Sequence, residues 1–362
     1  MGSLDMNNKP NPISKYYIAY FDILGYREYF NENPDRIENF LNIINEVINR
    51  TKFGLSTVNN SFLAQQVGNL KIESKIFSDN ILLVSEFETD ISKGKTKLVT
   101  FMEIIIEIQR MFVLEYGLFV RGGITYGNLS INDDYIFGQG LIEAVEIEER
   151  TTYPRIAISD LVLNYLQNEI PYTQDDIDKT NSIIEQSNKG EAVSEEQKSF
   201  ADGIYRLYNQ ETLLRCLYIP MLYQYDDSIW SLSYLNAFDI SKFFPQETLP
   251  QVIEIMKQIS PEEASQMPLT SPDINKMLER HKQIVEEKLI KYSDYSRFNT
   301  NDIKAFEINE KVLKKYVWAM VYHNYICALN HNTEQFINTN GNCERRHMKL
   351  VIHVVRNQNH QE

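Results

Sequence analysis

The order of strand and helix patterns between residues 16 and 159 is the feature that most restricts the fold of this chain. Strand patterns are short runs of β-branched and aromatic residues, and helix patterns repeat apolar residues every three or four positions. They begin in the order β-α-β-β-α-β, which predicts the ferredoxin-like α+β fold, with helices covering one face of an antiparallel sheet. The strands are expected at 16–21, 70–77, 81–85, 118–124, 135–137 and 155–159, and the helices at 34–50, 98–116 and 138–149.

Beyond residue 160 the patterns weaken and then become helical. Residues 170–200 are polar and acidic with few apolar anchors, so we expect a mobile surface excursion or a frayed helix there. Strand-like runs then return weakly, and long amphipathic helix patterns follow them. These strands are expected at 204–208, 216–219 and 229–238, and the helices at 247–259, 274–292 and 301–330.

The chain is therefore divided into four parts. Residues 1–13 are expected to be a disordered leader, whose first five residues, MGSLD, are interpreted as the remnant of an expression tag. Residues 14–240 form the α+β domain, residues 241–332 a helical C-terminal region, and residues 333–362 a polar tail.

Length and composition narrow the class of protein. The 362 residues, 43% of them hydrophobic, suffice for one sizeable core and a smaller second one. Cys216, Cys327 and Cys343 are scattered, which favours a reducing, cytoplasmic compartment, and Cys343 with His347 lacks the further ligands of a zinc site. No apolar run nears the roughly 20 residues of a membrane span. The net charge of −14 argues against nucleic acid as a partner.

Two aspartates are the candidate metal ligands. Asp22 ends the first strand, and Asp79 lies at the tip of the hairpin between 70–77 and 81–85. In the ferredoxin-like order the first and third strands are neighbours, so both carboxylates are expected at one end of the sheet. Paired carboxylates with open positions suit Mg²⁺ or Mn²⁺, although an isolated aspartate at a strand end is more often a turn or cap residue.

Glycines mark two further stretches near these acids. Residues 22–26, DILGY, contain a glycine turn that leads into a helix, where successive backbone N–H groups can cradle phosphate oxygens. Residues 121–127, RGGITYG, place glycines at a strand end, where the backbone can approach a ligand or another strand closely. The alternative for the second stretch is a β-bulge.

Together these motifs resemble the class III adenylate and guanylate cyclases. Residues 21–26, FDILGY, are similar to the family's F-x-D-I-x-G-F segment less one residue, 77–79, FSD, to its I-G-D hairpin, and 121–127 to R-x-G-I-x-x-G. The similarity extends over residues 14–165. It implies an enzyme that closes a nucleoside triphosphate into a 3′,5′-cyclic monophosphate, at composite sites formed between the two subunits of a homodimer.

The resemblance also implies roles for individual residues. Asp22 and Asp79 would hold two Mg²⁺ or Mn²⁺ ions, with the Ile23 carbonyl as a further ligand. The substrate-binding positions would be the amides of Leu24, Gly25 and Tyr26 on the triphosphate, Lys75 and Tyr135 at the base, and Arg121 in the glycine-rich motif.

Lys75 and Tyr135 bear on the choice of base. They stand where the adenylate cyclases carry a lysine and an aspartate that read adenine. Tyrosine is larger than aspartate and cannot accept a bond from an exocyclic amine as a carboxylate would, which favours a smaller pyrimidine. Lys75 only donates and suits a uracil carbonyl, whereas Glu73, on the same strand face, would favour the amino group of cytosine.

The chain is also similar to the pyrimidine cyclases of the bacterial Pycsar anti-phage system. Besides the motifs above, this likeness is carried by GQG at 138–140 and KYVW at 315–318. It implies conversion of UTP, or else CTP, into cyclic UMP or cyclic CMP, a signal that activates a separate effector protein.

One departure from the cyclase pattern keeps other functions open. The family's transition-state Asn and Arg, four and eight residues after the glycine, correspond to Ile142 and Glu146. Neither side chain can do that work, so Arg150, Arg155 or a lysine from the partner would have to substitute. The alternatives are a purine cyclase in which Lys75 still reads adenine, and a catalytically silent module that binds a nucleotide.

Overall fold

The computed structural model describes most of the chain between residues 12 and 337. The described residues are 12–36, 40, 42, 44–49, 70–132, 134–168, 172–205, 221–225, 227–235, 274–294, 303–329 and 332–337. The strand predicted at 216–219, the helix predicted at 247–259 and the pair Cys343 and His347 lie outside them. Among the described residues, no helix is both long enough and apolar enough to cross a membrane.

One sheet organises the molecule, in the strand order β2-β3-β1-β4-β6-β8-β7, with β5 paired to β4. Strand β1 is antiparallel to both of its neighbours, β3 and β4, whereas β4 and β6 are parallel. The order β2-β3-β1-β4, with helices after β1 and β3, confirms the predicted ferredoxin-like fold. The strands are β1 Ser14–Leu24, β2 Glu73–Phe77, β3 Asn80–Glu86, β4 Phe119–Ile131, β5 Ile136–Phe137, β6 Ile156–Ile158, β7 Leu222–Gln224 and β8 Trp230–Leu232.

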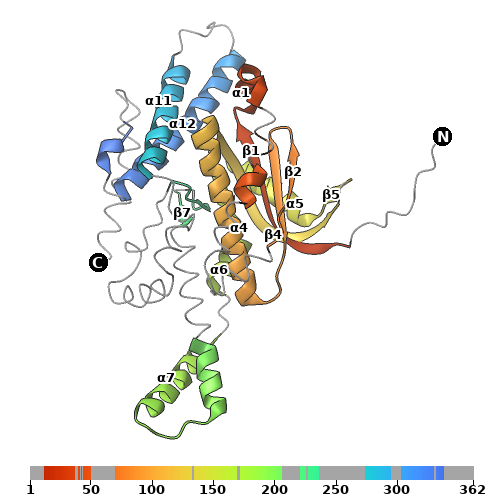
Figure 1. Ribbon diagram of the computed structural model, residues 1–362. Coiled ribbons are helices and arrows are strands. Elements are labelled where there is room, and N and C mark those ends of the chain that lie inside the picture. Colours follow the sequence, from red (N-terminus) through yellow and green to blue (C-terminus); the bar gives the residue numbers. More distant parts are fainter. Residues whose placement is uncertain are drawn as a thin grey trace, which may run out of the picture.

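Helix α4, Ile91–Met111, covers one face of the sheet and lines the main core (Figure 1). It continues as a π-helix at Phe112–Tyr116 and ends at Gly117. The φ of Gly117 is 64°, in the left-handed region that glycine adopts without strain, as the sequence predicts for this position.

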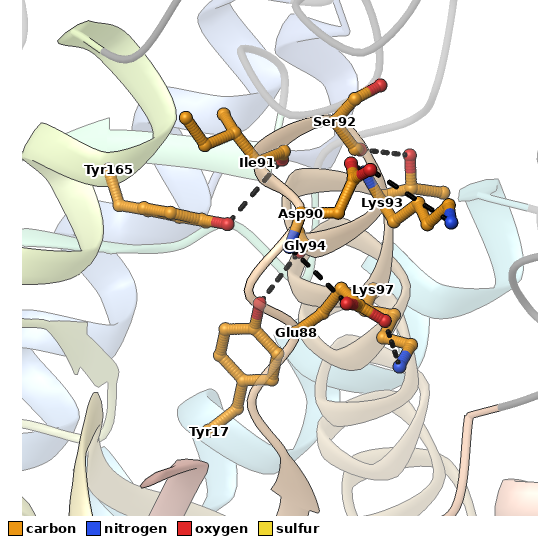
Figure 2. A network of polar contacts seen from close by, with 10 residues as sticks. Tyr17, Glu88, Asp90, Ile91, Ser92, Lys93, Gly94, Lys97 and Tyr165 are labelled. Carbon is orange, nitrogen blue, oxygen red and sulfur yellow. Dashed lines mark hydrogen bonds and ion pairs between the residues drawn. The ribbon is translucent and has the colours of Figure 1, made fainter.

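Polar contacts hold the N-terminus of α4 against the sheet (Figure 2). The Asp90 carboxylate caps the helix by accepting a hydrogen bond from the Lys93 N–H at 3.0 Å, and the Tyr17 hydroxyl of β1 donates to the Gly94 carbonyl, also at 3.0 Å. A side-chain cap of this kind satisfies one of the unpaired N–H groups of the first turn. The helix therefore begins at residue 91, and the predicted start at residue 98 is wrong, because apolar spacing alone does not reveal the cap.

Helix α5, Gln139–Arg150, lies on the opposite face of the sheet and is an addition to the ferredoxin-like kernel. Glycines permit its close packing: a Cβ on Gly123 of β4 would lie 2.6 Å from Ile147, and one on Gly140 would lie 2.4 Å from Ile18. The glycine-rich stretch of β4 thus brings this helix onto the strand, and no bulge is needed to explain it.

The C-terminal helices α11, Ile274–Ser293, and α12, Ile303–Leu329, lie side by side (Figure 1) and match the predicted helices. They contribute to the main core through residues that are almost fully buried. The Phe119 ring of β4 lies 5.1 Å from the His281 ring and 5.9 Å from the Tyr316 ring. The helical C-terminal region therefore packs directly on the strand that carries Arg121. Its buried residues include Met277, Leu278, Val285, Trp318, Ala319, Tyr322 and Cys327.

The polar segment at 172–205 forms two helices, at 174–188 and 195–205, so the helical alternative of the prediction is the one observed, and the first helix is capped rather than frayed. Helix α7, Gln174–Asn188, starts with a capping box in which Thr173 and Asp176 each accept a hydrogen bond from the other's N–H. Residues 195–205 form a second helix, so the predicted strand is wrong at 204 and 205. Caps and ion pairs such as Lys189 with Glu185, at 2.6 Å, replace the apolar anchors that the prediction required.

The remaining differences concern short elements. Helices α1, Tyr26–Glu32, and α6, Asp160–Asn168, were not predicted. The helix predicted at 34–50 begins as a 3-10 turn at Pro34–Arg36 and is α-helical at 40, 42 and 44–49, and a further 3-10 turn lies at Thr333–Gln335. Strand β8 is shorter than the predicted 229–238, because the chain turns at residues 234 and 235.

Candidate functional site

The structure brings Asp22 and Asp79 to the same end of neighbouring strands. Asp22, near the end of β1, lies opposite Asn80 at the start of β3, and Asp79 is the turn residue just before Asn80. The Ile23 N–H donates a hydrogen bond to the Asp79 carbonyl at 2.8 Å, which ties the turn to β1. Ser78, with a φ of 59°, makes the reversal tight. The two acids are thus neighbours across the strand pair, although 57 positions separate them in the sequence.

The side chain of Asp79 is positioned by two polar neighbours. The Asn80 amide donates to Asp79 Oδ1 at 3.2 Å, and the Tyr20 hydroxyl donates to Asn80 Oδ1 at 2.8 Å. Tyr20 lies two residues before Asp22 on β1 and therefore on the same face of the sheet. This chain of hydrogen bonds sets the Asp79 carboxylate on the face that Asp22 also occupies.

Arg121 connects Asp22 to a third acid, Glu148. Its Nη2 lies 3.3 Å from Asp22 Oδ2 and 2.5 Å from Glu148 Oε1. The Glu148 contact is an ion pair without the angle of a directed hydrogen bond, and Arg121 Nε has no hydrogen-bond partner among the described residues. Because Glu148 is 8% exposed and belongs to the last turns of α5, this helix supports the arginine from the side.

Burial and competing charges act on both acids that contact Arg121. Burial raises the pKa of Asp22; the Arg121 guanidinium opposes this shift, the charge of Asp79 adds to it, and Lys315 opposes it. Burial likewise raises the pKa of Glu148; the Arg121 guanidinium opposes this shift, and the charge of Asp22 adds to it. Carboxylates that lie close together in a partly buried place favour an added cation, because it relieves both their repulsion and their desolvation.

The glycine turn follows directly on Asp22. Gly25 has a φ of 82° and precedes α1, and its carbonyl accepts a hydrogen bond from the Tyr29 N–H at 3.0 Å. The first N–H groups of a helix have no partner within the helix. Leu24, Gly25 and Tyr26 therefore present their backbone beside the acids, at the end of β1.

Lys75 and Tyr135 lie on opposite flanks of the central sheet. Lys75 is on the edge strand β2, opposite Leu82 of β3, and Tyr135 precedes β5, where its N–H donates to Asn132 Oδ1 at 2.9 Å. Strands β3, β1 and β4 stand between them. One copy of the chain therefore does not bring these two side chains together.

The positions that depart from the cyclase pattern are on the outer side of α5. Ile142 is 51% exposed and Glu146 is exposed, with its carbonyl accepting a hydrogen bond from Arg150 Nε at 3.1 Å. Arg155 cannot take the missing role, because it is 1% exposed and bound to Asp227. Of the three substitutes that the sequence leaves open, Arg155 is therefore excluded, and Arg150 lies at the surface.

The residues at the end of β1 fit a divalent cation of the hard type. Mg²⁺ commonly takes one or two carboxylates and fills its other positions with water and substrate phosphates. Asp22 and Asp79 supply that pair, and Ile23 adds a backbone carbonyl beside them. The described part of the chain holds no group of three or more His, Cys, Asp or Glu that could enclose an ion without a substrate.

A pocket of about 450 Å³ lies elsewhere, between α5, the start of α6 and β8. It is lined by Ile147, Arg150, Ser159, Asp160 and Trp230, among others, and by neither of the two aspartates. The pocket is therefore separate from the carboxylate pair.

Glu148 and Lys315 are the neighbours of Asp22 to which the sequence patterns assigned no part in the site. Glu148 is an acid on the inner side of α5, and a buried acid in an amphipathic helix is a signal that it has a cationic partner. Lys315 belongs to the KYVW stretch but lies 293 positions from Asp22. Only the packing of α12 on the sheet reveals its place.

Comparisons with known proteins add little to this geometry. No model of a known protein family matches the chain, and no curated protein does. Among solved structures it is similar to two of bacterial light-regulated adenylyl cyclases, each at 14% identity with a TM-score of 0.28. The match covers 45% of this chain and 48% of theirs, so the chain spans about half the length of those structures. A likeness this weak supports no inference about activity.

Proposed function

We propose that the protein is a nucleotide cyclase of the class III type, which converts UTP, or else CTP, into the 3′,5′-cyclic monophosphate and pyrophosphate. One observation carries this proposal: Asp22 and Asp79 meet at one end of β1 and β3, directly before a glycine turn and beside Arg121. This arrangement provides carboxylates for divalent cations, backbone N–H groups for phosphate oxygens and a cation for the same anion.

In the proposed reaction, the ribose 3′-oxygen attacks the α-phosphorus, the bond to the β-phosphate oxygen breaks, and pyrophosphate leaves. Asp22, Asp79 and the Ile23 carbonyl would hold two Mg²⁺ or Mn²⁺ ions, which would lower the pKa of the 3′-hydroxyl and neutralise charge on the leaving group. The proton of the 3′-hydroxyl passes to solvent. The amides of Leu24 to Tyr26 orient the triphosphate, and no protein nucleophile takes part.

The preference for a pyrimidine rests on Lys75 and Tyr135. A lysine donates to a uracil carbonyl, and the bulk of a tyrosine reduces the space that a purine needs. Because these residues lie on opposite flanks of one sheet, a pocket that uses both requires two subunits, as in a homodimer with composite sites. Glu73, two residues before Lys75, is the feature that would favour CTP.

Two other functions remain candidates because of specific residues. A purine cyclase is favoured if Lys75 reads adenine without help from Tyr135. A silent nucleotide-binding module is favoured by Ile142 and Glu146, which supply neither the amide nor the guanidinium expected on α5. As part of the lead proposal, the cyclic pyrimidine nucleotide acts as a signal in anti-phage defence and activates a separate effector protein.

The deciding experiment incubates the protein with each of the four nucleoside triphosphates and Mn²⁺, and separates the products. Asp22→Ala and Asp79→Ala are the test variants, and Asp178→Ala, on the exposed side of α7, is the matched control. Cyclic UMP or CMP that disappears in both test variants and persists in the control supports the proposal. Cyclic AMP alone overturns the base preference, and nucleotide binding without any product favours the silent module.

A further inference from the structure

We propose that Lys315, on the C-terminal helix α12, binds the triphosphate of the substrate together with Arg121. This assignment deepens the proposed function and rests on it. It makes the helical region part of the site of its own subunit, where the nucleotide would lie between the ends of β1 and β4 and the side of α12.

The packing of α12 explains why Lys315 lies at this end of the sheet. The next residue, Tyr316, has its ring 5.9 Å from that of Phe119, which pairs with Leu24 of β1. Phe119 is two residues before Arg121 on β4, so the contact sets α12 beside the strand ends that carry the site. Lys315 is thus held near the site because the next residue, Tyr316, packs against Phe119.

A second set of contacts fixes α12 from the other side. The Tyr316 ring stacks on the Tyr292 ring of α11, with centroids 5.7 Å apart and planes 8° apart. Tyr292 in turn donates to Glu28 of α1 at 3.2 Å, and Lys291 forms an ion pair with the same carboxylate. Helix α1 begins immediately after the glycine turn that follows Asp22. The end of β1 and α12 are therefore held in one packed unit (Figure 1).

The electrostatic surroundings of Lys315 are those of the site. It is half-buried, and burial together with the nearby Arg121 lowers its pKa, whereas Asp22 and Glu148 raise it. Among the described residues no carboxylate lies within 4.0 Å of its ammonium group, unlike Arg121, which contacts two. A half-buried ammonium that faces acids without pairing with any of them is suited to an anionic ligand that has yet to bind.

A structural role makes a different prediction for the same lysine. If Lys315 only balances the charge of Asp22 and Glu148, its removal lowers the stability of the fold and affects all ligands alike. If it binds the triphosphate, its removal lowers the affinity for an anion. The affinity for a divalent cation stays the same or rises, because one positive charge has gone from beside the metal ligands. The two roles therefore differ in the sign of the effect on Mn²⁺.

The test measures binding to the full chain by calorimetry, with Mn²⁺ alone and then with inorganic tripolyphosphate in the presence of Mn²⁺. Tripolyphosphate carries no base, so the result does not depend on which nucleotide the enzyme prefers. For Lys315→Ala we expect the tripolyphosphate affinity to fall at least about 10-fold, as the loss of a charge-assisted hydrogen bond predicts, with Mn²⁺ affinity unchanged or higher. Lys315→Arg should retain most of the affinity, and Lys314→Ala, at the exposed neighbouring position, should match the wild type.

The outcomes separate this inference from the proposed function. Tripolyphosphate affinity unchanged in Lys315→Ala overturns the inference, and so does a joint loss of both ligands with a lower melting temperature. If the wild type forms a cyclic nucleotide, such a result leaves the proposed function intact. If the wild type binds both probes with the expected pattern and yet forms no product from any triphosphate, the proposed function fails while the phosphate-binding role of Lys315 stands.

Discussion

Helix α12 borders two polar clusters of opposite character. At its middle lies the charged cluster of Asp22, Asp79, Arg121, Glu148 and Lys315. Two turns further on lies a second group, which we call the ring layer, made of Tyr223, Tyr234, Tyr322, His281 and His323, each at most 7% exposed.

The ring layer is neutral and closely packed, although the Tyr223 hydroxyl, His281 Nδ1 and His323 Nδ1 have no hydrogen-bond partner among the described residues. The Tyr322 hydroxyl accepts from the Leu235 N–H at 3.1 Å, and the Tyr234 hydroxyl shares a hydrogen bond with His281 at 3.0 Å. The His281 and His323 rings stack 5.2 Å apart. Burial lowers the pKa of both histidines and raises that of the tyrosines, so every member is uncharged near neutral pH.

The charged cluster contains three acids against two basic groups, so charge rather than hydrogen-bond satisfaction separates it from the ring layer. Neutral aromatic groups that pack together under burial serve the stability of a fold, whereas unbalanced charges held close together reduce it and are retained where a ligand uses them. The contrast predicts that substitutions in the charged cluster change activity and substitutions in the ring layer change stability.

The largest effect should come from Asp22→Asn. We expect cyclic nucleotide formation to fall by about 1,000-fold or more, because a metal ligand is lost, while the melting temperature stays equal or rises. The rise follows because burial raises the pKa of Asp22, so the fold disfavours its charge. Product assays and thermal unfolding on the same preparation check both parts. A clear fall in melting temperature would show that Asp22 stabilises the fold, as the ring layer does, and would contradict the contrast between the two clusters.

The pH dependence of stability should come from the ring layer. Burial lowers the pKa of His323 from 6.5 to about 4, and its hydrogen bond to the Gln335 carbonyl only partly opposes this. The unfolded chain therefore takes up a proton that the folded one refuses, so stability is complete above pH 6.5 and falls between there and about 4.

The variant His323→Gln removes this titration while keeping a donor for Gln335. Between pH 7.5 and pH 5, we expect the wild type to lose about 2 kcal/mol more of its free energy of unfolding than the variant does. Denaturant unfolding at the two pH values measures the difference. Parallel losses in both proteins would show that His323 is protonated equally in the folded and unfolded states.

The smallest effect is expected for Tyr322→Phe. The change leaves the ring in place but deprives the buried Leu235 N–H of its acceptor and Ser233 of its partner. The free energy of unfolding should fall by about 1–2 kcal/mol, with turnover by the folded enzyme unchanged. Denaturant titration and initial rates at low temperature measure the two quantities. A loss of turnover at unchanged stability would show that the ring layer contributes to activity and not only to stability.

Sequence patterns predicted the parts of the fold that local chemistry determines. The turn at Ser78 and Asp79, the end of the helix at Gly117 and the neighbouring positions of β1 and β3 follow from turn residues, a left-handed glycine and strand order. Helices α1 and α6 were missed because each is short, and aromatic residues such as Tyr26 and Tyr165 fit strands equally well.

The candidate site could be predicted from the sequence only in the same way, where local chemistry and strand order determine it. The pair Asp22 and Asp79 could be proposed because each lies next to a strand end whose neighbours follow from the topology. The contacts of Arg121 with Glu148, and the approach of Lys315, depend on how α5 and α12 pack, and periodicity within a helix carries no information about its distance from a remote strand.

If the protein acts as proposed, the glycines beneath α5 add positions far from the nucleotide to those at which a substitution would abolish activity. A methyl group at Gly123 has no room under Ile147, one residue before Glu148, so any side chain there would lift the helix and displace the acid that steadies Arg121. A random screen for inactive mutants should consequently return substitutions of Gly123 about as readily as substitutions of the acids. A smaller residue in place of Ile147 would not make room for alanine at this position, because its Cβ would also lie 2.7 Å from the backbone carbonyl oxygen of Ala144.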